Sequence, residues 1–163
     1  RHLLEHLSVD QEIRIDEHIE RVIHDAFGRI LDRHDPEIRA AALKAIELNP
    51  RHDGAFHVMG RWNAEIMRLS SIERFFAKSF LGGAVFSQAS WDNAVANMKR
   101  AAGIRPEFIY HHYDLALIYI DTKQWSLARQ QLEQIPALPL IDVMDPVWKK
   151  EAAGFLQSIA NKK

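Results

Sequence analysis

The chain has 163 residues, of which 47% are hydrophobic and 26% are charged, a composition typical of one folded domain with its own core. Its 21 basic and 22 acidic residues give a net charge of −1 without long blocks of either sign, so nucleic acid is not an expected partner. The absence of cysteine excludes thiol catalysis, thiolate metal sites and disulfides, and no apolar run is long enough to predict a transmembrane segment.

The chain begins at Arg1 rather than at a methionine. A leader, a membrane anchor or a further domain upstream therefore stays an open alternative, and the localisation is left unknown. The oligomeric state and the identity of any partner are also left open by the sequence.

Two helices are expected in the first 50 residues. The segment Ser8–Gln11 has the S-x-x-Q pattern of a capping box, and apolar residues at helical spacing follow it, which predicts a helix near 9–33. Asp35-Pro36 places an N-cap before a proline at the first helical position, and an apolar stripe continues to Asn49-Pro50. These signals predict a second helix at about 37–48.

The most informative pattern is a partial self-match at a spacing of 34 residues. This is the period of the tetratricopeptide repeat, a pair of antiparallel helices. Small residues in the match, Ala94 and Ala128, are expected to lie close to Gly60 and Ala116 on the partner helices. We therefore predict an all-α fold, a tetratricopeptide-like stack of antiparallel helix pairs, or α-α superhelix, of about 8 helices. The matching positions are Trp91, Ala94, Met98 and Ala101, then Trp125, Ala128, Leu132 and Ile135.

The repeat that precedes this match is interrupted. Pro50 and Pro106 each close a helix, and their separation exceeds one repeat by about 22 residues, which predicts an insertion at about 65–88. The insertion is expected to contain a helix of its own near 71–81, because Ser70–Glu73 forms another capping box. The two helices of the interrupted repeat are expected near 53–69 and 90–104.

The next repeat is regular, with helices expected at about 107–122 and 125–135. Pro136 and Pro139 then break the chain. Asp145-Pro146 begins a helix that we expect to cap the apolar face of the last repeat. The predicted organisation is one tetratricopeptide-like domain over 1–163, with N-terminal helices in 1–50, the repeat with its insertion in 51–106, a second repeat in 107–136 and a C-terminal capping helix in 145–161.

A concave groove is expected along the first helix of each repeat. Arg61 is the first candidate for ligand recognition, since a guanidinium suits phosphate or carboxylate groups, although it could instead pair with Glu65 one turn later. Asp114 lies where a carboxylate-binding clamp would need a cation or an amide, so we expect no clamp of that kind. The candidate groove residues are His57, Arg61, Ala64, Tyr110, Tyr113, Leu117 and Ile120.

The insertion is rich in phenylalanine and could form a lid over a lipid cavity. The alternative is that these aromatic side chains only pack the insertion onto the stack. The candidate lid residues are Phe75, Phe76, Phe80 and Phe86.

No metal, cofactor or catalytic residue is predicted. His2 and His6 do not form the H-E-x-x-H pattern, and the adjacent His111 and His112 point to different helix faces, so the nine histidines are expected at the surface or at helix caps. The sequence also lacks G-x-S-x-G, a phosphate-binding loop and a cysteine nucleophile, so we do not expect an enzyme.

Particular strings resemble the regulator of microtubule dynamics family, a tetratricopeptide-like family. They are His57 to Trp62, Leu69 to Arg74 with Ala77 and Gly82, and Ser90 to Ala94, and the resemblance extends from about Ala42 to the end. It implies a non-enzymatic helical domain. Some members contact organelle membranes, and one is described as binding phospholipid in its repeat domain. The sequence therefore favours a scaffold that binds a protein or peptide partner in its groove, with phospholipid or another apolar ligand, bound under the Phe-rich insertion, as the alternative.

Overall fold

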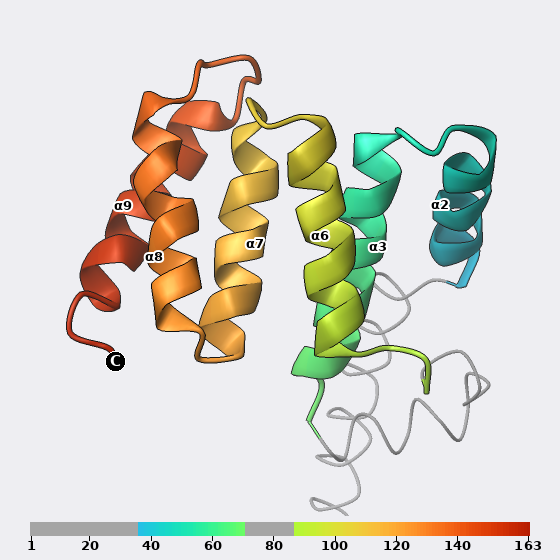
Figure 1. Ribbon diagram of the computed structural model, residues 1–163, viewed down its shortest axis with the longest axis horizontal. Coiled ribbons are helices and arrows are strands. Elements are labelled where there is room, and N and C mark those ends of the chain that lie inside the picture. The colour runs from blue at the N-terminus through green and yellow to red at the C-terminus, as the bar shows by residue number, and fades with distance from the viewer. Residues whose placement is uncertain (1–35, 71–86) are drawn as a thin grey trace, which may run out of the picture.

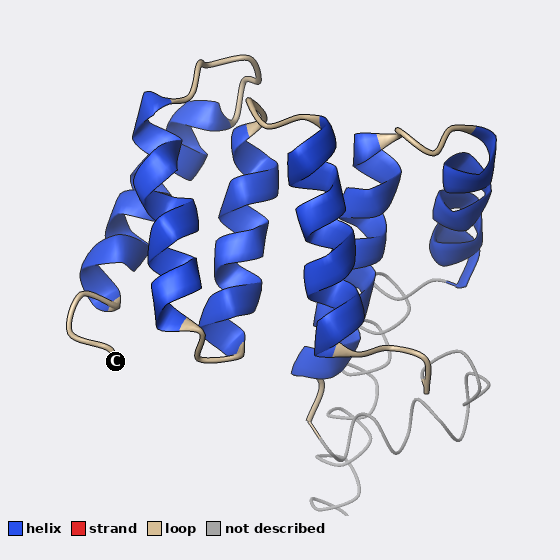
Figure 2. Cartoon of the chain, viewed as in Figure 1, coloured by secondary structure: helices blue, strands red, loops and turns tan. Residues whose placement is uncertain are grey.

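The computed structural model describes residues 36–70 and 87–163, and every regular element in these two ranges is a helix (Figures 1 and 2). The all-α prediction is therefore confirmed for this part of the chain. The helices expected near 9–33 and 71–81 lie outside the described residues. The described elements are α2 (Pro36–Leu48), α3 (Asp53–Arg68), α6 (Trp91–Ile104), α7 (Ile109–Asp121), α8 (Trp125–Gln134), the short 3-10 helix η1 (Ile135–Ala137) and α9 (Asp145–Ser158).

Local side chains account for where several helices begin. Nδ1 of His52 accepts a hydrogen bond from the backbone N–H of Ala55 and caps α3, while Oγ of Ser90 accepts from Asn93 and caps α6. Asp145 does not act as the N-cap of α9. It lies in the first turn, and its fully buried carboxylate accepts from the backbone N–H groups of Ile141 and Asp142, which ties down the preceding loop.

The described helices pack mainly against their neighbours in sequence. The largest interface joins α3 and α6, the next joins α7 and α8, and α6 also packs against α7. Helix α9 contacts both α7 and α8, and α7 also contacts α3. Figure 1 shows α6 in front of α3 and α8 in front of α9. Helix α7 contacts both α3 and α9, and we call the side formed by α3, α7 and α9 the inner face.

Close contact between α3 and α6 depends on a glycine. A Cβ atom added to Gly60 would lie 3.0 Å from Cε of Met98 and 3.2 Å from its backbone nitrogen. The sequence placed Ala94 opposite Gly60, whereas the closest atoms belong to Met98, one turn further along α6. The core continues through α7 and α8, where Ala116, Ala128 and Leu132 are at most 1% exposed.

Candidate functional site: the inner face

Three helices of the inner face each contribute one side chain to a connected cluster. Arg61 of α3 donates a hydrogen bond to the hydroxyl of Tyr110 on α7, and its guanidinium carbon lies 5.8 Å from the centre of the tyrosine ring. The Tyr110 ring in turn stacks on Trp148 of α9, with 4.7 Å between ring centres and 14° between planes. The Arg61 side chain is 45% exposed, and both aromatic residues are half-buried. We call these three residues the inner-face cluster.

Tyr113 is held between α7 and α9 and does not present its ring to a ligand. It is 5% exposed, and its hydroxyl donates to Oε2 of Glu151 at 2.5 Å. Its ring lies 5.0 Å from Trp148 and 6.1 Å from Phe155. Burial, together with the hydrogen bond to Glu151 and its charge, raises the pKa of the Tyr113 hydroxyl well above its usual range. The tyrosine therefore joins the last helix to the stack.

A chain of four polar side chains links α3 to α7 beneath the cluster. Nε2 of His111 lies 3.0 Å from Oδ2 of Asp53, and Nδ1 of His111 lies 2.9 Å from Nδ1 of His57. Nε2 of His57 then lies 3.1 Å from Oδ2 of Asp114, a close approach without a hydrogen bond. Both histidines are buried, at 1% and 7% exposure, so the chain forms the polar part of the α3–α7 interface.

The electrostatics of this polar chain indicate the roles of the two ring nitrogens of His111. Burial lowers the pKa of His111 to about 4, with the hydrogen bond to Asp53 opposing the shift. Burial alone would raise the pKa of Asp53, but its hydrogen bond with His111 and the charge there lower it overall. A neutral His111 donates from Nε2 to Asp53 and accepts at Nδ1, so His57 donates from its own Nδ1.

Asp114 connects the polar chain to the exposed cation of the inner face. Its Oδ2 lies 3.6 Å from Nε of Arg61 as well as 3.1 Å from His57. His57 and Arg61 were predicted for the groove, whereas Asp114 was considered only as a residue that would exclude a carboxylate clamp; in the structure the three side chains lie close together. The carboxylate faces two basic side chains, and it positions Arg61 beside Tyr110.

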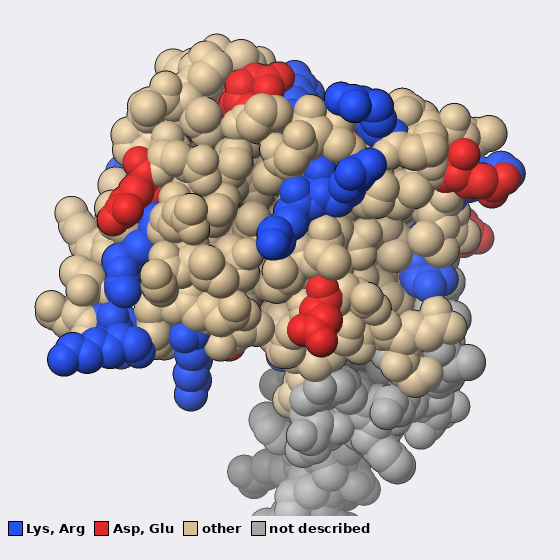
Figure 3. All heavy atoms as spheres, viewed as in Figure 1, with Lys and Arg blue, Asp and Glu red and all other residues tan. Residues whose placement is uncertain are grey.

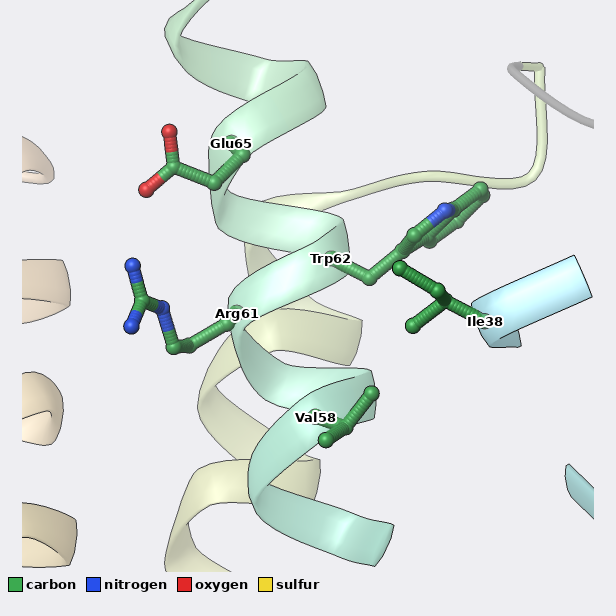
Figure 4. Close-up of a pocket in the computed structure, with 5 residues that line it drawn as sticks. All are labelled: Ile38, Val58, Arg61, Trp62 and Glu65. Carbon is green, nitrogen blue, oxygen red and sulfur yellow. The ribbon is translucent and has the colours of Figure 1, made fainter. Parts of the chain in front are cut away.

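A pocket of about 280 Å³ lies where α2 meets α3. Figure 4 shows Arg61 and Glu65 pointing to one side of α3, while Trp62 points to the other, toward Ile38 of α2. Glu65 pairs with Arg68 at 2.6 Å, and Arg61 has Asp114 and Tyr110 as partners. The pocket is lined by Ile38, Val58, Arg61, Trp62 and Glu65.

The other residues predicted for the groove lie in different surroundings. Ala64 is 1% exposed and packs in the core, while Leu117 and Ile120 are half-buried against it. The four candidate lid residues, Phe75, Phe76, Phe80 and Phe86, lie outside the described residues.

The histidine prediction is correct at one position and wrong at three. His52 caps a helix, but His57, His111 and His112 are buried rather than at the surface. His112 is held by Gln131 and by the carbonyl of Pro106. Across residues 36–70 and 87–163, no group of three or more metal-ligating side chains is placed to hold an ion.

Sequence reasoning missed two contributors to the inner face. Trp148 and Glu151 were assigned only to a capping helix, yet they lie three residues apart, on one side of α9, and face Tyr110 and Tyr113. The three-residue spacing of Trp148 and Glu151, on a helix expected to pack against the last repeat, was the sequence signal that could have indicated their shared face.

These observations define an all-helical domain made of successive packed helices, with an arginine and aromatic cluster on one face. The sequence matches the family described as regulator of microtubule dynamics protein 1-3 over residues 33–160, and the chain belongs to that family. No curated protein and no solved structure matches the chain. Among the helices that the structure describes, none is both long enough and apolar enough to cross a membrane.

Proposed function

We propose that this chain is a tetratricopeptide-like scaffold that binds a peptide or helix of a partner protein on its inner face. The observation that carries the proposal is the inner-face cluster, in which Arg61, Tyr110 and Trp148 come together from three helices. Arginine, tyrosine and tryptophan are the residue types most enriched at binding hot spots. The proposal contains no catalytic step.

The helix register supports the tetratricopeptide-like part of the proposal. Helices α6 and α8 begin at Trp91 and Trp125, at the two ends of the 34-residue period, and each packs against the helix that precedes it in the described chain. In such a stack α3, α7 and α9 are the first helices of successive units, and these helices supply the inner-face cluster. A partner lying across them would contact all three.

The cluster is organised in advance of binding. Asp114 and Tyr110 hold the guanidinium of Arg61, and Trp148 holds the ring of Tyr110 by stacking. Side chains that are already ordered lose less conformational freedom when a partner binds. A carboxylate or a backbone carbonyl of the partner can accept from the remaining N–H groups of Arg61, while apolar side chains lie on the exposed parts of the rings. The family description concerns regulation of microtubule dynamics, a role compatible with protein partners.

A peptide library displayed on phage, selected on the immobilised domain, tests the proposal. Peptides from the selection should bind the unmodified domain, and the double substitution Arg61→Ala with Tyr110→Ala should weaken binding by about 2 kcal/mol or more, roughly thirtyfold in Kd. Lys44→Ala is the control, because its side chain is exposed on α2 and pairs only with Glu47 among the described residues. Equal affinities in both variants would show that the selected peptides use another surface.

The alternative is an apolar-ligand carrier, with phospholipid as the candidate ligand. It depends on the four phenylalanines of the insertion, so the inner-face cluster does not bear on it. Native mass spectrometry of gently purified protein, before and after exposure to liposomes, would show a bound lipid as an added mass. An unchanged mass in both samples would exclude this function.

A further inference from the structure

A small pocket on the side of the molecule away from the inner face gathers positive charge. Its volume is about 200 Å³, and it lies where the turn between α2 and α3 meets the end of α6. Figure 3 shows lysine and arginine side chains together over α6 on this side. We call it the basic pocket, and its lining residues are Arg51, Lys99, Arg100, Gly103 and Ile104.

Among the residues that the structure describes, the three cations of the basic pocket have no acidic partner. Within the described part of the chain, the side chains of Arg51 and Lys99 form no ion pair, and the guanidinium of Arg100 lies over the Phe56 ring at 5.8 Å. Like charges gathered in this way repel one another, and the repulsion is reduced when an anion binds between them.

Two carboxylates close in sequence to the lining residues are already engaged elsewhere. Asp53 lies 3.0 Å from His111 and 3.9 Å from Arg105, and Glu107 lies 3.4 Å from Arg105. The negative end of the α6 dipole can favour cations near its last turns, but Arg51 comes from a different segment. The pocket therefore combines charges from two elements around one hollow.

The surroundings of the basic pocket favour a narrow anionic partner over a broad one. Asp92 lies seven residues before Lys99 on the same side of α6, about 10 Å away along the helix axis. A flat anionic membrane would approach Asp92 and be repelled by it, whereas a single extended strand of acidic peptide crossing α6 would meet only the cations.

We propose that the basic pocket binds carboxylate side chains of an acidic segment in a partner protein. This site is distinct from the inner-face cluster and does not depend on it. Arg51 and Arg100 can each donate two parallel hydrogen bonds to a carboxylate, and Lys99 supplies a third positive charge beside them.

Titration of the ¹⁵N-labelled domain with hexaglutamate tests this proposal by NMR. We expect amide shifts concentrated near Arg51 and over Lys99–Ile104, with an affinity that falls as salt is added. The triple variant Arg51→Gln, Lys99→Gln, Arg100→Gln should weaken hexaglutamate binding about tenfold or more, because each exposed pair contributes modestly. Arg61→Ala should leave it unchanged, which separates this site from the inner face.

A variant of equal net charge is the matched control. Lys150→Gln, Lys162→Gln, Lys163→Gln removes three exposed positive charges from the C-terminal part of the chain and should retain hexaglutamate affinity within about twofold. Equal weakening in both triple variants would overturn the proposal in favour of an effect of net charge. Absence of shifts with hexaglutamate, or shifts at the pocket with inorganic phosphate or phosphatidylserine vesicles but not with the peptide, would overturn it as well.

Discussion

The helix pair α3–α6 and the pair α7–α8 are joined in very different ways, yet each packs as a unit. Residues 69–90 separate the first two helices, whereas only residues 122–124 separate the second two. In both pairs the later helix buries a small residue and a large one at matching positions, Ala94 with Met98 and Ala128 with Leu132, all at most 1% exposed. The comparison indicates that the side chains of the interface, rather than the length of the connection, determine how each pair packs.

Truncating the large residue of each pair is the strongest test of this comparison. Met98→Ala and Leu132→Ala should each lower the free energy of unfolding by about 2–5 kcal/mol, because both side chains are fully enclosed and leave a cavity. Urea denaturation measures both, with Leu127→Ala, at a 39% exposed position of α8, as a control expected to cost less. A loss below about 1 kcal/mol for Met98→Ala alone would mean that the interrupted pair is not held by its interface.

The stability of the contact between the α3–α6 pair and the α7–α8 pair should depend on pH, because His111 lies at the α3–α7 interface. Its pKa in the fold is about 4, below the ordinary 6.5, so the unfolded chain takes up the proton first as the pH falls. The stabilising contribution is complete above pH 6.5 and is lost as the pH falls toward 4. We expect about 2 kcal/mol less stability at pH 5 than at pH 7 from this group.

Comparing His111→Gln with the unmodified protein isolates that effect. The variant should be less stable at pH 7 but should lose less stability between pH 7 and pH 5, as measured by urea denaturation at each pH. An identical pH dependence in the two proteins would contradict the role assigned to His111.

The smallest expected effect concerns residues 122–124, the short connection between α7 and α8. Lys123 has a φ of 58°, and the N–H of Gln124 donates to the carbonyl of Tyr119 across the end of α7. Glycine adopts this left-handed conformation without steric cost, so Lys123→Gly should raise the free energy of unfolding by about 0.5–1 kcal/mol. A thermal melt that shows lower stability would indicate that the lysine side chain has an unrecognised contact.

Much of the described fold could be predicted because its signals are local. The helix expected at 53–69 is α3, and the one expected at 90–104 is α6, each within about one residue. Proline positions, caps and the 34-residue period all act within a short stretch of chain. The sequence predicted Ala94 as the neighbour of Gly60, but the closest side chain is Met98, one turn later on α6. The repeat period does not specify how far the two helices slide along each other.

The candidate site was less predictable because its contacts are distant in sequence. The helix register predicted that Arg61 shares a side of α3 with His57, and in the structure both residues lie beside Asp114. The bond between Asp53 and His111 joins residues 58 positions apart, and no local pattern indicates it. Tyr113 was expected in the groove and is instead covered by α9, because its burial depends on how the last helix docks.

Binding of a protein segment to the inner face can be tested directly by following the tryptophan indole signals in an NMR titration. Trp148 belongs to the inner-face cluster, whereas Trp125 begins α8, which is not one of the inner-face helices. On addition of a peptide selected on the domain, we expect the indole N–H of Trp148 to shift and that of Trp125 to remain in place. A shift of Trp125 without one of Trp148 would show that the peptide binds away from the inner face.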